Sequence, residues 1–179
     1  MSILVIGDVH AKVGKYYNLV SGQHWGLLNK YKGVTSSIQV GDFGFERHHN
    51  FHIDNVDPSI HKVLMGNHDF IPFLDAPHSL GDYSYDDKTG IFTVRGAHSI
   101  DKQARTEGLD WFESEEIPYM GWYDIIDEYE RVKPRFVITH EAPLSVRTSL
   151  FGYTKGSITS RALEELFSIH KPDLSLIHI

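Results

Sequence analysis

Residues 61–69 read HKVLMGNHD, a short apolar strand followed at once by glycine, asparagine, histidine and aspartate. Gly66 allows the chain to turn sharply as it leaves the strand. Asn67 offers a neutral carbonyl oxygen, which is a reasonable ligand for a hard divalent cation. His68 can carry a proton, and Asp69 can fix the tautomer of its ring. The stretch therefore predicts a strand that ends in a metal-binding and proton-transferring turn.

Three other predicted strands also end in polar residues. They are residues 2–7 before Asp8 and His10, residues 37–40 before Asp42, and residues 136–139 before His140. Strands that alternate with helical segments predict one α/β domain, and in such folds the functional groups gather at the carboxyl ends of the strands. We therefore expect the four polar clusters to meet at one end of the molecule.

The residue types in these clusters are those of a metal site. Asp8 and His10 are two residues apart, so in an extended segment their side chains point to the same side and can converge on one cation. Asp42 adds a carboxylate whose two oxygens can bridge two cations, and His140 adds an imidazole. Each cluster alone is also compatible with an ordinary turn or cap, so the combination carries the prediction.

Composition limits the classes of protein that fit. The 179 residues suit one domain with a buried core, and 41% hydrophobic content is ordinary for a globular protein. The absence of cysteine excludes a disulfide framework, a Cys-ligated zinc and a thiol nucleophile. A net charge of −7 argues against broad electrostatic adhesion to nucleic acid. No secretory signal or membrane span is recognisable, so we expect a soluble cytoplasmic protein.

Local patterns predict the remaining elements. Residues 82–86 and 91–95 flank a turn and predict a hairpin, and Lys171-Pro172-Asp173 should lead into a last strand. Helices are expected over residues 15–30, 107–116, 122–131 and 160–169, the last with Thr159 as its N-cap.

Read in chain order, the four polar blocks resemble the pattern of the calcineurin-like metallophosphoesterase family and cover most of the chain. The resemblance implies an α/β fold, a two-layer β-sandwich flanked by helices. It also implies two divalent metal ions, manganese, iron or zinc, about 3.5–4 Å apart. Carried over by position, Asp8 and His10 would hold the first ion, and Asp42 would bridge the two. Asn67 and His140 would hold the second ion.

The resemblance further implies hydrolysis of a phosphate-ester substrate by a hydroxide that bridges the two metals. His68 would protonate the leaving alkoxide, and Asp69 would orient the imidazole ring. Two alternatives stay open. One is a phosphodiesterase or nuclease on the same scaffold, with nucleic acid only as substrate. The other is a non-catalytic scaffold that has kept the fold, against which the pair of His68 and Asp69 argues.

A polar segment, RGAHSID (95–101), follows the hairpin. Related phosphoesterases place a loop that faces the substrate nearby, so Arg95, His98 and Asp101 are candidates to line the cleft.

The C-terminal residues depart from the family pattern. After Asp173 the family continues with a strand and Gly-His-x-His, whereas this chain reads LSLIHI over residues 174–179. The common transposase adapter of sequencing libraries, CTGTCTCTTATACACATC, translates in frame to these six residues. We therefore expect residues 1–173 to be one metallophosphoesterase domain that is incomplete at its C-terminus, and residues 174–179 to be a non-native tail. The alternative is a genuine short strand, because the residues are good β-formers.

Overall fold

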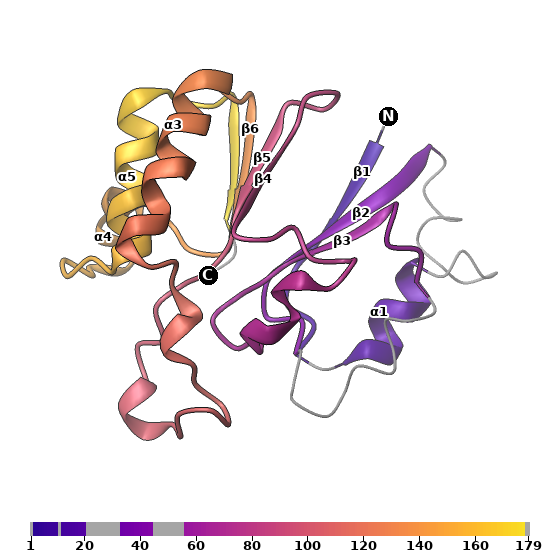
Figure 1. Cartoon of the computed structure of the whole chain (residues 1–179), viewed down its shortest axis with the longest axis horizontal. Helices are drawn as coiled ribbons and strands as arrows, with labels where there is room; N and C mark the ends of the chain where they lie inside the picture. The colour runs from indigo at the N-terminus through magenta and orange to yellow at the C-terminus, as the bar shows by residue number, and fades with distance from the viewer. Residues whose placement is uncertain (1, 11, 21–32, 45–55, 178–179) are drawn as a thin grey trace.

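The computed structural model describes residues 2–10, 12–20, 33–44 and 56–177 (Figure 1). Two β-sheets pack face to face in its centre, and helices cover the outer face of each sheet. The first part of the chain builds one sheet, and the second part builds the other. The α/β class that the resemblance implied, a two-layer β-sandwich flanked by helices, is confirmed.

The first sheet is entirely parallel. Its strands, in spatial order, are β1 (Ser2–Ile6), β2 (Val34–Val40) and β3 (His61–Leu64). The central strand is therefore β2, which begins three residues before the strand expected from residue 37. The helix α1 (Val13–Val20) covers the outer face of this sheet. The rest of the helix expected over residues 15–30 falls mainly on residues 21–32, which lie outside the described part of the chain.

The second sheet is mixed. Its strands, in spatial order, are β4 (Tyr83–Asp86), β5 (Ile91–Val94), β6 (Phe136–Thr139) and β7 (Leu174–Ile177). The antiparallel pair of β4 and β5 confirms the expected hairpin, whose turn ends at Gly90 with φ 70°. The strand expected after Asp173 is also present, since β7 pairs in parallel with β6. The origin of residues 174–179 stays a prediction.

The helices α3 (Trp122–Val132) and α5 (Ile158–Ile169) cover the outer face of the second sheet, and α4 (Leu144–Phe151) packs against α5. The N-cap of α5 is Ser157, whose Oγ accepts a hydrogen bond from the N–H of Ser160, so the assignment of Thr159 as the cap was two residues late. The sequence did not predict α4, whose apolar residues are not confined to one face.

The prediction of a helix over residues 107–116 is wrong. This segment forms irregular turns and one 3-10 turn, η4 (Glu113–Glu115). Gly108 adopts φ 78°, which an α-helix cannot contain, and the carboxylate of Asp110 accepts the backbone N–H of Thr106. Such side-chain hydrogen bonds to the local backbone compete with helical hydrogen bonds. The spacing of apolar residues therefore gave a wrong prediction for this segment.

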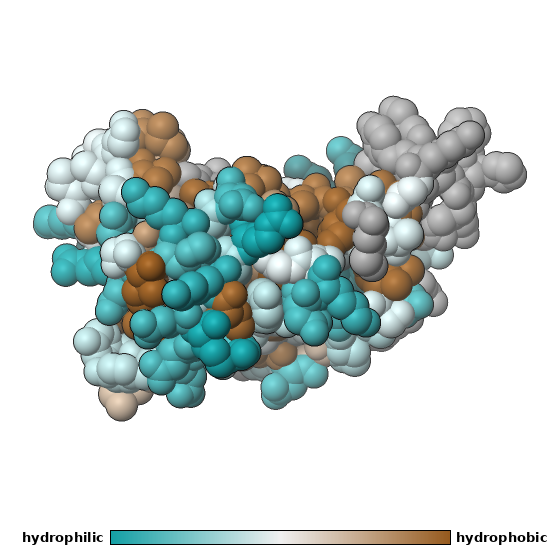
Figure 2. Space-filling model, turned by 90° about the horizontal axis from the view of Figure 1, so that it is seen from above, coloured by the Kyte–Doolittle hydropathy of each residue, from teal (hydrophilic) through white to brown (hydrophobic). Residues whose placement is uncertain are grey.

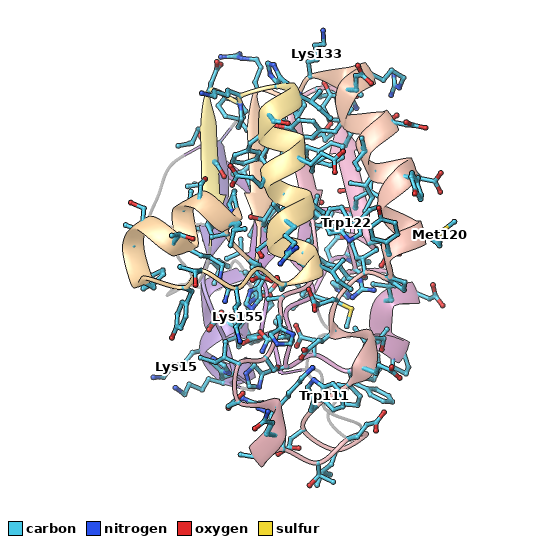
Figure 3. The ribbon with its side chains drawn as sticks, turned by 90° about the vertical axis from the view of Figure 1, so that its left-hand side faces the viewer. Lys15, Trp111, Met120, Trp122, Lys133 and Lys155 are labelled. Atoms are coloured by element: carbon cyan, nitrogen blue, oxygen red, sulfur yellow. The ribbon has the colours of Figure 1, made fainter. Side chains whose placement is uncertain are left out.

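Three apolar layers hold the described part together. Ile38, Val40, Leu64 and Ile138 lie between the two sheets. A second layer, including Tyr16 and Val63, joins α1 to the first sheet, and a third joins α3 and α5 to the second. In Figure 3, Trp122 of that third layer points inward, whereas Met120 points into solvent.

Seen from above, the side of the molecule that carries α3 and α5 is mainly hydrophilic, with apolar groups in small separate patches (Figure 2). Within the described residues, no helix has the length and apolar character needed to cross a membrane.

Candidate metal centre

Asp42 stands at the centre of the site because it follows β2, the middle strand of the first sheet. Its side chain is only 6% exposed. One carboxylate oxygen, Oδ2, lies 4.0 Å from Nε2 of His10, and the other, Oδ1, lies 3.4 Å from Nε2 of His140. The two oxygens thus face two different sets of candidate ligands, which is the arrangement that a bridging carboxylate requires.

Asp8 and His10 come together on one side of Asp42, with Nε2 of His10 2.9 Å from Oδ2 of Asp8. The reason is not the extended spacing that we expected, because β1 ends at Ile6 and His10 has φ 43°. A left-handed turn brings the imidazole back, and the N–H of His10 donates to the carbonyl of Asp42 at 2.8 Å. Ligand atoms of Asp8, His10 and Asp42 all lie within 4.8 Å of one another.

Asn67 and His140 come together on the other side, with Oδ1 of Asn67 3.1 Å from Nε2 of His140. Nδ1 of His140 lies 2.9 Å from the carbonyl oxygen of Val40, which can only accept a hydrogen bond. In a neutral imidazole the proton is therefore on Nδ1, and Nε2 carries a lone pair. Nε2, Oδ1 of Asn67 and Oδ1 of Asp42 are then three acceptors that converge, which fits a cation.

Backbone conformation at the site is unusual. His10 and Asp42, with φ 43° and 49°, are two of the three non-glycine residues with positive φ in the described part of the chain. This region is unfavourable for residues with a Cβ, and such strain persists where the surrounding structure fixes it, most often at functional sites. Here the hydrogen bond from His10 to the carbonyl of Asp42 joins the two strained turns.

Gly41 and Gly66 are required for the close approach of these groups. A Cβ on Gly41, which has φ 108°, would overlap the ring of His140. A Cβ on Gly66 would collide with Oδ1 of Asp42 and lie 2.8 Å from Nε2 of His140. The glycines that precede Asp42 and Asn67 in the sequence therefore make room for ligands from the other loops.

His68 lies over the site, with its side chain 30% exposed. Its Nε2 is 3.8 Å from Oδ2 of Asp42, and its ring packs edge-to-face with that of His10, with 5.7 Å between the ring centroids. Its backbone N–H donates to Oδ1 of Asp42 at 3.0 Å. The imidazole is thus next to the metal ligands and open to the pocket, as a proton donor to a substrate must be.

Asp69 has three backbone hydrogen-bond partners. Its buried carboxylate accepts backbone N–H groups from Phe43, Gly44 and Gly66, at 2.8 to 3.2 Å. Asp69 therefore ties the turn after β3 to the loop after β2. Its expected role in orienting the ring of His68 stays a prediction.

A family model described as calcineurin-like phosphoesterase matches residues 1–177. The chain belongs to this family. The comparison with curated proteins gives no match. Membership supports metal-dependent hydrolysis of phosphate esters, and Asp8, His10 and Asp42 form a candidate metal-binding group.

Arg105 is a residue of the pocket that the sequence did not single out. Its guanidinium nitrogens lie 2.7 Å from Nδ1 and 3.0 Å from Nε2 of His68. Asp101 holds it with two hydrogen bonds, of 2.7 and 2.8 Å, which lower the pKa of Asp101. No motif marks this irregular segment, in which η3 (Lys102–Ala104) is a single 3-10 turn, so only proximity in space identifies Arg105.

Of the three loop residues proposed to line the cleft, two do so and one does not. His98 and Asp101 line the same pocket as the metal-ligand candidates, whereas Arg95 is buried. Arg95 donates to the carboxylate of Asp82 at 2.5 Å and to the carbonyl of Ser114 at 3.0 Å, so it holds the second sheet to the segment near η4.

The pocket over the metal-ligand candidates has a volume of about 350 Å³. Next to His140, burial raises the pKa of Glu141 to about 7, and the contact with the guanidinium of Arg147 opposes this rise. Phe151 and Tyr153 form a half-exposed aromatic wall at the rim. The pocket is large enough for a phosphoryl group together with an organic leaving group.

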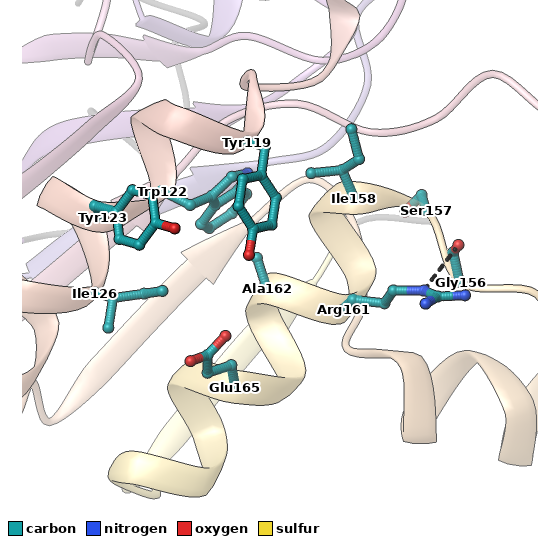
Figure 4. A pocket seen from close by; sticks show the side chains of 10 residues that line it. All are labelled: Tyr119, Trp122, Tyr123, Ile126, Gly156, Ser157, Ile158, Arg161, Ala162 and Glu165. Atoms are coloured by element: carbon teal, nitrogen blue, oxygen red, sulfur yellow. Dashed lines mark hydrogen bonds between the residues drawn. The ribbon is translucent and has the colours of Figure 1, made fainter.

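A second pocket, of about 430 Å³, lies between α3 and α5 (Figure 4). Its walls are mainly aromatic and aliphatic, with Arg161 and Glu165 as the charged side chains. It contains no histidine and one carboxylate, so it cannot assemble a metal centre of the kind seen at Asp42. The metal-ligand candidates line the smaller of these two pockets.

Proposed function

We propose that the protein hydrolyses phosphate esters at a site for two divalent cations, manganese, iron or zinc. The observation that carries the proposal is the position of Asp42, whose two oxygens face different ligand sets. Asp8 and His10 would hold one cation, and Asn67 and His140 the other. Carboxylate oxygen, amide oxygen and imidazole nitrogen together suit these metals.

When bound, the two cations would acidify a water molecule at neutral pH and neutralise charge on the phosphoryl oxygens. The protein contributes the proton for the leaving group and the position of the substrate. His68 is the proposed proton donor, because its ring is exposed to the pocket and lies beside Asp42. General acid catalysis by a positioned side chain contributes about 10²–10⁴-fold to the rate.

Arg105 is proposed to help orient the ring of His68. A guanidinium can only donate, so Arg105 can hydrogen-bond the one ring nitrogen that carries no proton, while Asp101 and the carbonyl of Asp110 hold its other N–H groups. It also brings positive charge to a pocket on a protein of net charge −7, which favours entry of a phosphate anion. Asp69 is proposed to keep the loops after β2 and β3 together.

The test is a hydrolysis assay with nitrophenyl phosphate and bis-nitrophenyl phosphate. Protein stripped with a chelator should be inactive, and activity should return when manganese, iron or zinc is added. The preferred compound identifies a monoesterase or a diesterase. Bound metal without turnover of either compound would instead indicate the non-catalytic scaffold.

A further inference from the structure

The side-chain amide of Asn67 has an oxygen and an NH₂ group of similar size, and either could face the metal centre. Only the oxygen can ligate a cation. Oδ1 lies 3.1 Å from Nε2 of His140, whereas Nδ2 donates to Oγ of Ser99 at 2.9 Å. Rotation of the amide by half a turn would place N–H donors among the ligand atoms of His140 and Asp42. The site therefore needs a feature that distinguishes the two ends.

The hydroxyl of Ser99 provides this feature because its own proton is used elsewhere. Oγ of Ser99 donates to Oε2 of Glu115 at 2.5 Å, and the backbone N–H of Ser99 donates to Oε1 at 2.9 Å. A carboxylate can only accept, so the hydroxyl proton points to Glu115, and a lone pair of Oγ points to Asn67. Ser99 and Glu115 are each 2% exposed, which leaves little access for water to replace either bond.

We propose that Ser99 and Glu115 are positioning residues that fix the direction of the hydrogen-bond chain from Asn67 through Ser99 to Glu115. This direction turns the oxygen of Asn67 toward the cation that it shares with His140. The inference rests on the proposed function. The three residues come from the turn after β3, the loop after β5 and η4, so their contact exists only in the folded protein.

The charge of Glu115 is the essential property. A buried carboxylate is unfavourable unless hydrogen bonds compensate it, so packing alone does not account for its presence. A glutamine in its place could donate to Oγ of Ser99. The hydroxyl proton would then point to Asn67 and turn the amide nitrogen toward the ligand atoms. A carboxylate excludes this reversed chain.

The first experiment measures metal binding in Ser99→Ala and Glu115→Gln, with Glu113→Gln as the control. Glu113 lies in the same 3-10 turn but is exposed. We expect the first two variants to lose about 10- to 100-fold in Mn²⁺ affinity at the second site, as for other partners that orient metal ligands. Electron paramagnetic resonance should change from a coupled pair to a single ion. The control should match the wild type, and an equal loss in all three variants would overturn the inference.

The second experiment is designed to reverse the direction of the hydrogen-bond chain. Asn67→Asp alone places a second carboxylate against Ser99, so two acceptors compete for one proton. In Asn67→Asp combined with Glu115→Gln, the new amide can donate to Ser99, and the hydroxyl can donate to the new carboxylate. We expect each single variant to lower the melting temperature of the metal-free protein. The double variant should recover most of this loss.

Additive losses in the double variant would overturn the inference, because the effects of substitutions at independent sites add. This result is distinguishable from failure of the proposed function. If the wild type binds fewer than two cations, the two-metal proposal fails. The melting temperatures of the metal-free single and double variants then still decide whether Ser99 and Glu115 set the direction of the chain.

Discussion

Oδ1 of Asn67 lies 3.1 Å from Nε2 of His140, although 73 positions separate the two residues in the chain. Asn67 follows β3 in the first sheet, and His140 follows β6 in the second, so their contact joins the two sheets at the carboxyl ends of their strands. Both atoms are acceptors when the proton of His140 is on Nδ1. The pair therefore gains most from a cation placed between its members.

Removal of the shared carboxylate should empty the site. In Asp42→Ala, both ligand sets lose the group that faces them, so we expect little bound manganese by elemental analysis. Turnover should fall by more than about 10²-fold, which is the upper range for loss of an indirect metal partner. Circular dichroism should show a folded protein. Retention of one full equivalent of metal would mean that Asp42 belongs to one ion only.

His68→Ala should separate catalysis from metal binding. We expect kcat to fall by about 10²–10⁴-fold, which is the usual contribution of general acid catalysis, while manganese content stays close to that of the wild type. The effect should be smaller for a substrate with a good leaving group such as nitrophenolate than for an alkyl phosphate. An equal loss of metal and turnover would assign His68 to the ligands.

Arg105→Ala tests whether the guanidinium orients His68. Hydrogen bonds to charged groups contribute about 1.5–3 kcal/mol, so kcat should fall by roughly 10- to 100-fold with metal content unchanged. Arg131→Ala is the matched control, since Arg131 also pairs with a carboxylate, that of Glu128, but is exposed on α3. Comparable activity of the two variants would argue against the role of Arg105.

Gly66→Ala and Gly14→Ala form a second matched pair. The added methyl group at Gly66 would collide with Oδ1 of Asp42 and approach His140, so we expect about 1–3 kcal/mol of destabilisation and weaker metal binding. Gly14 lies in α1 with no atom within 4 Å of the added Cβ, so alanine there should stabilise the helix by roughly 0.5–1 kcal/mol. Urea unfolding measures both, and a tolerated Gly66→Ala would contradict the close approach seen here.

Alkaline unfolding should depend on Tyr129. Burial raises the pKa of its phenol to about 12 in the folded protein, against about 10 in the unfolded chain. The stability linked to this group is therefore fully present below pH 10 and is lost as the pH rises to 12. We expect the free energy of unfolding to fall less steeply over this interval in Tyr129→Phe, as measured by urea unfolding at successive pH values.

Sequence alone located the metal-ligand candidates because each follows a recognisable apolar strand. A run such as FVIT can be read as a buried strand, and the residue after it, His140, must then lie at a carboxyl end. The hairpin and α3 were predicted for similar local reasons. The prediction of a helix over residues 107–116 was wrong, because the positive φ of Gly108 and the turn at Asp110 prevail over apolar spacing.

The order of residues along the chain therefore specifies the chemical groups and the strand ends that carry them. Tertiary structure alone decided which groups meet. Asp42 faces both ligand sets because β2 pairs on both edges, and Asp69 takes the N–H of Phe43, 26 positions away. Arg105 reaches His68 across 37 positions. Such contacts depend on how the sheets and loops pack, and residue spacing along the chain carries no record of that packing.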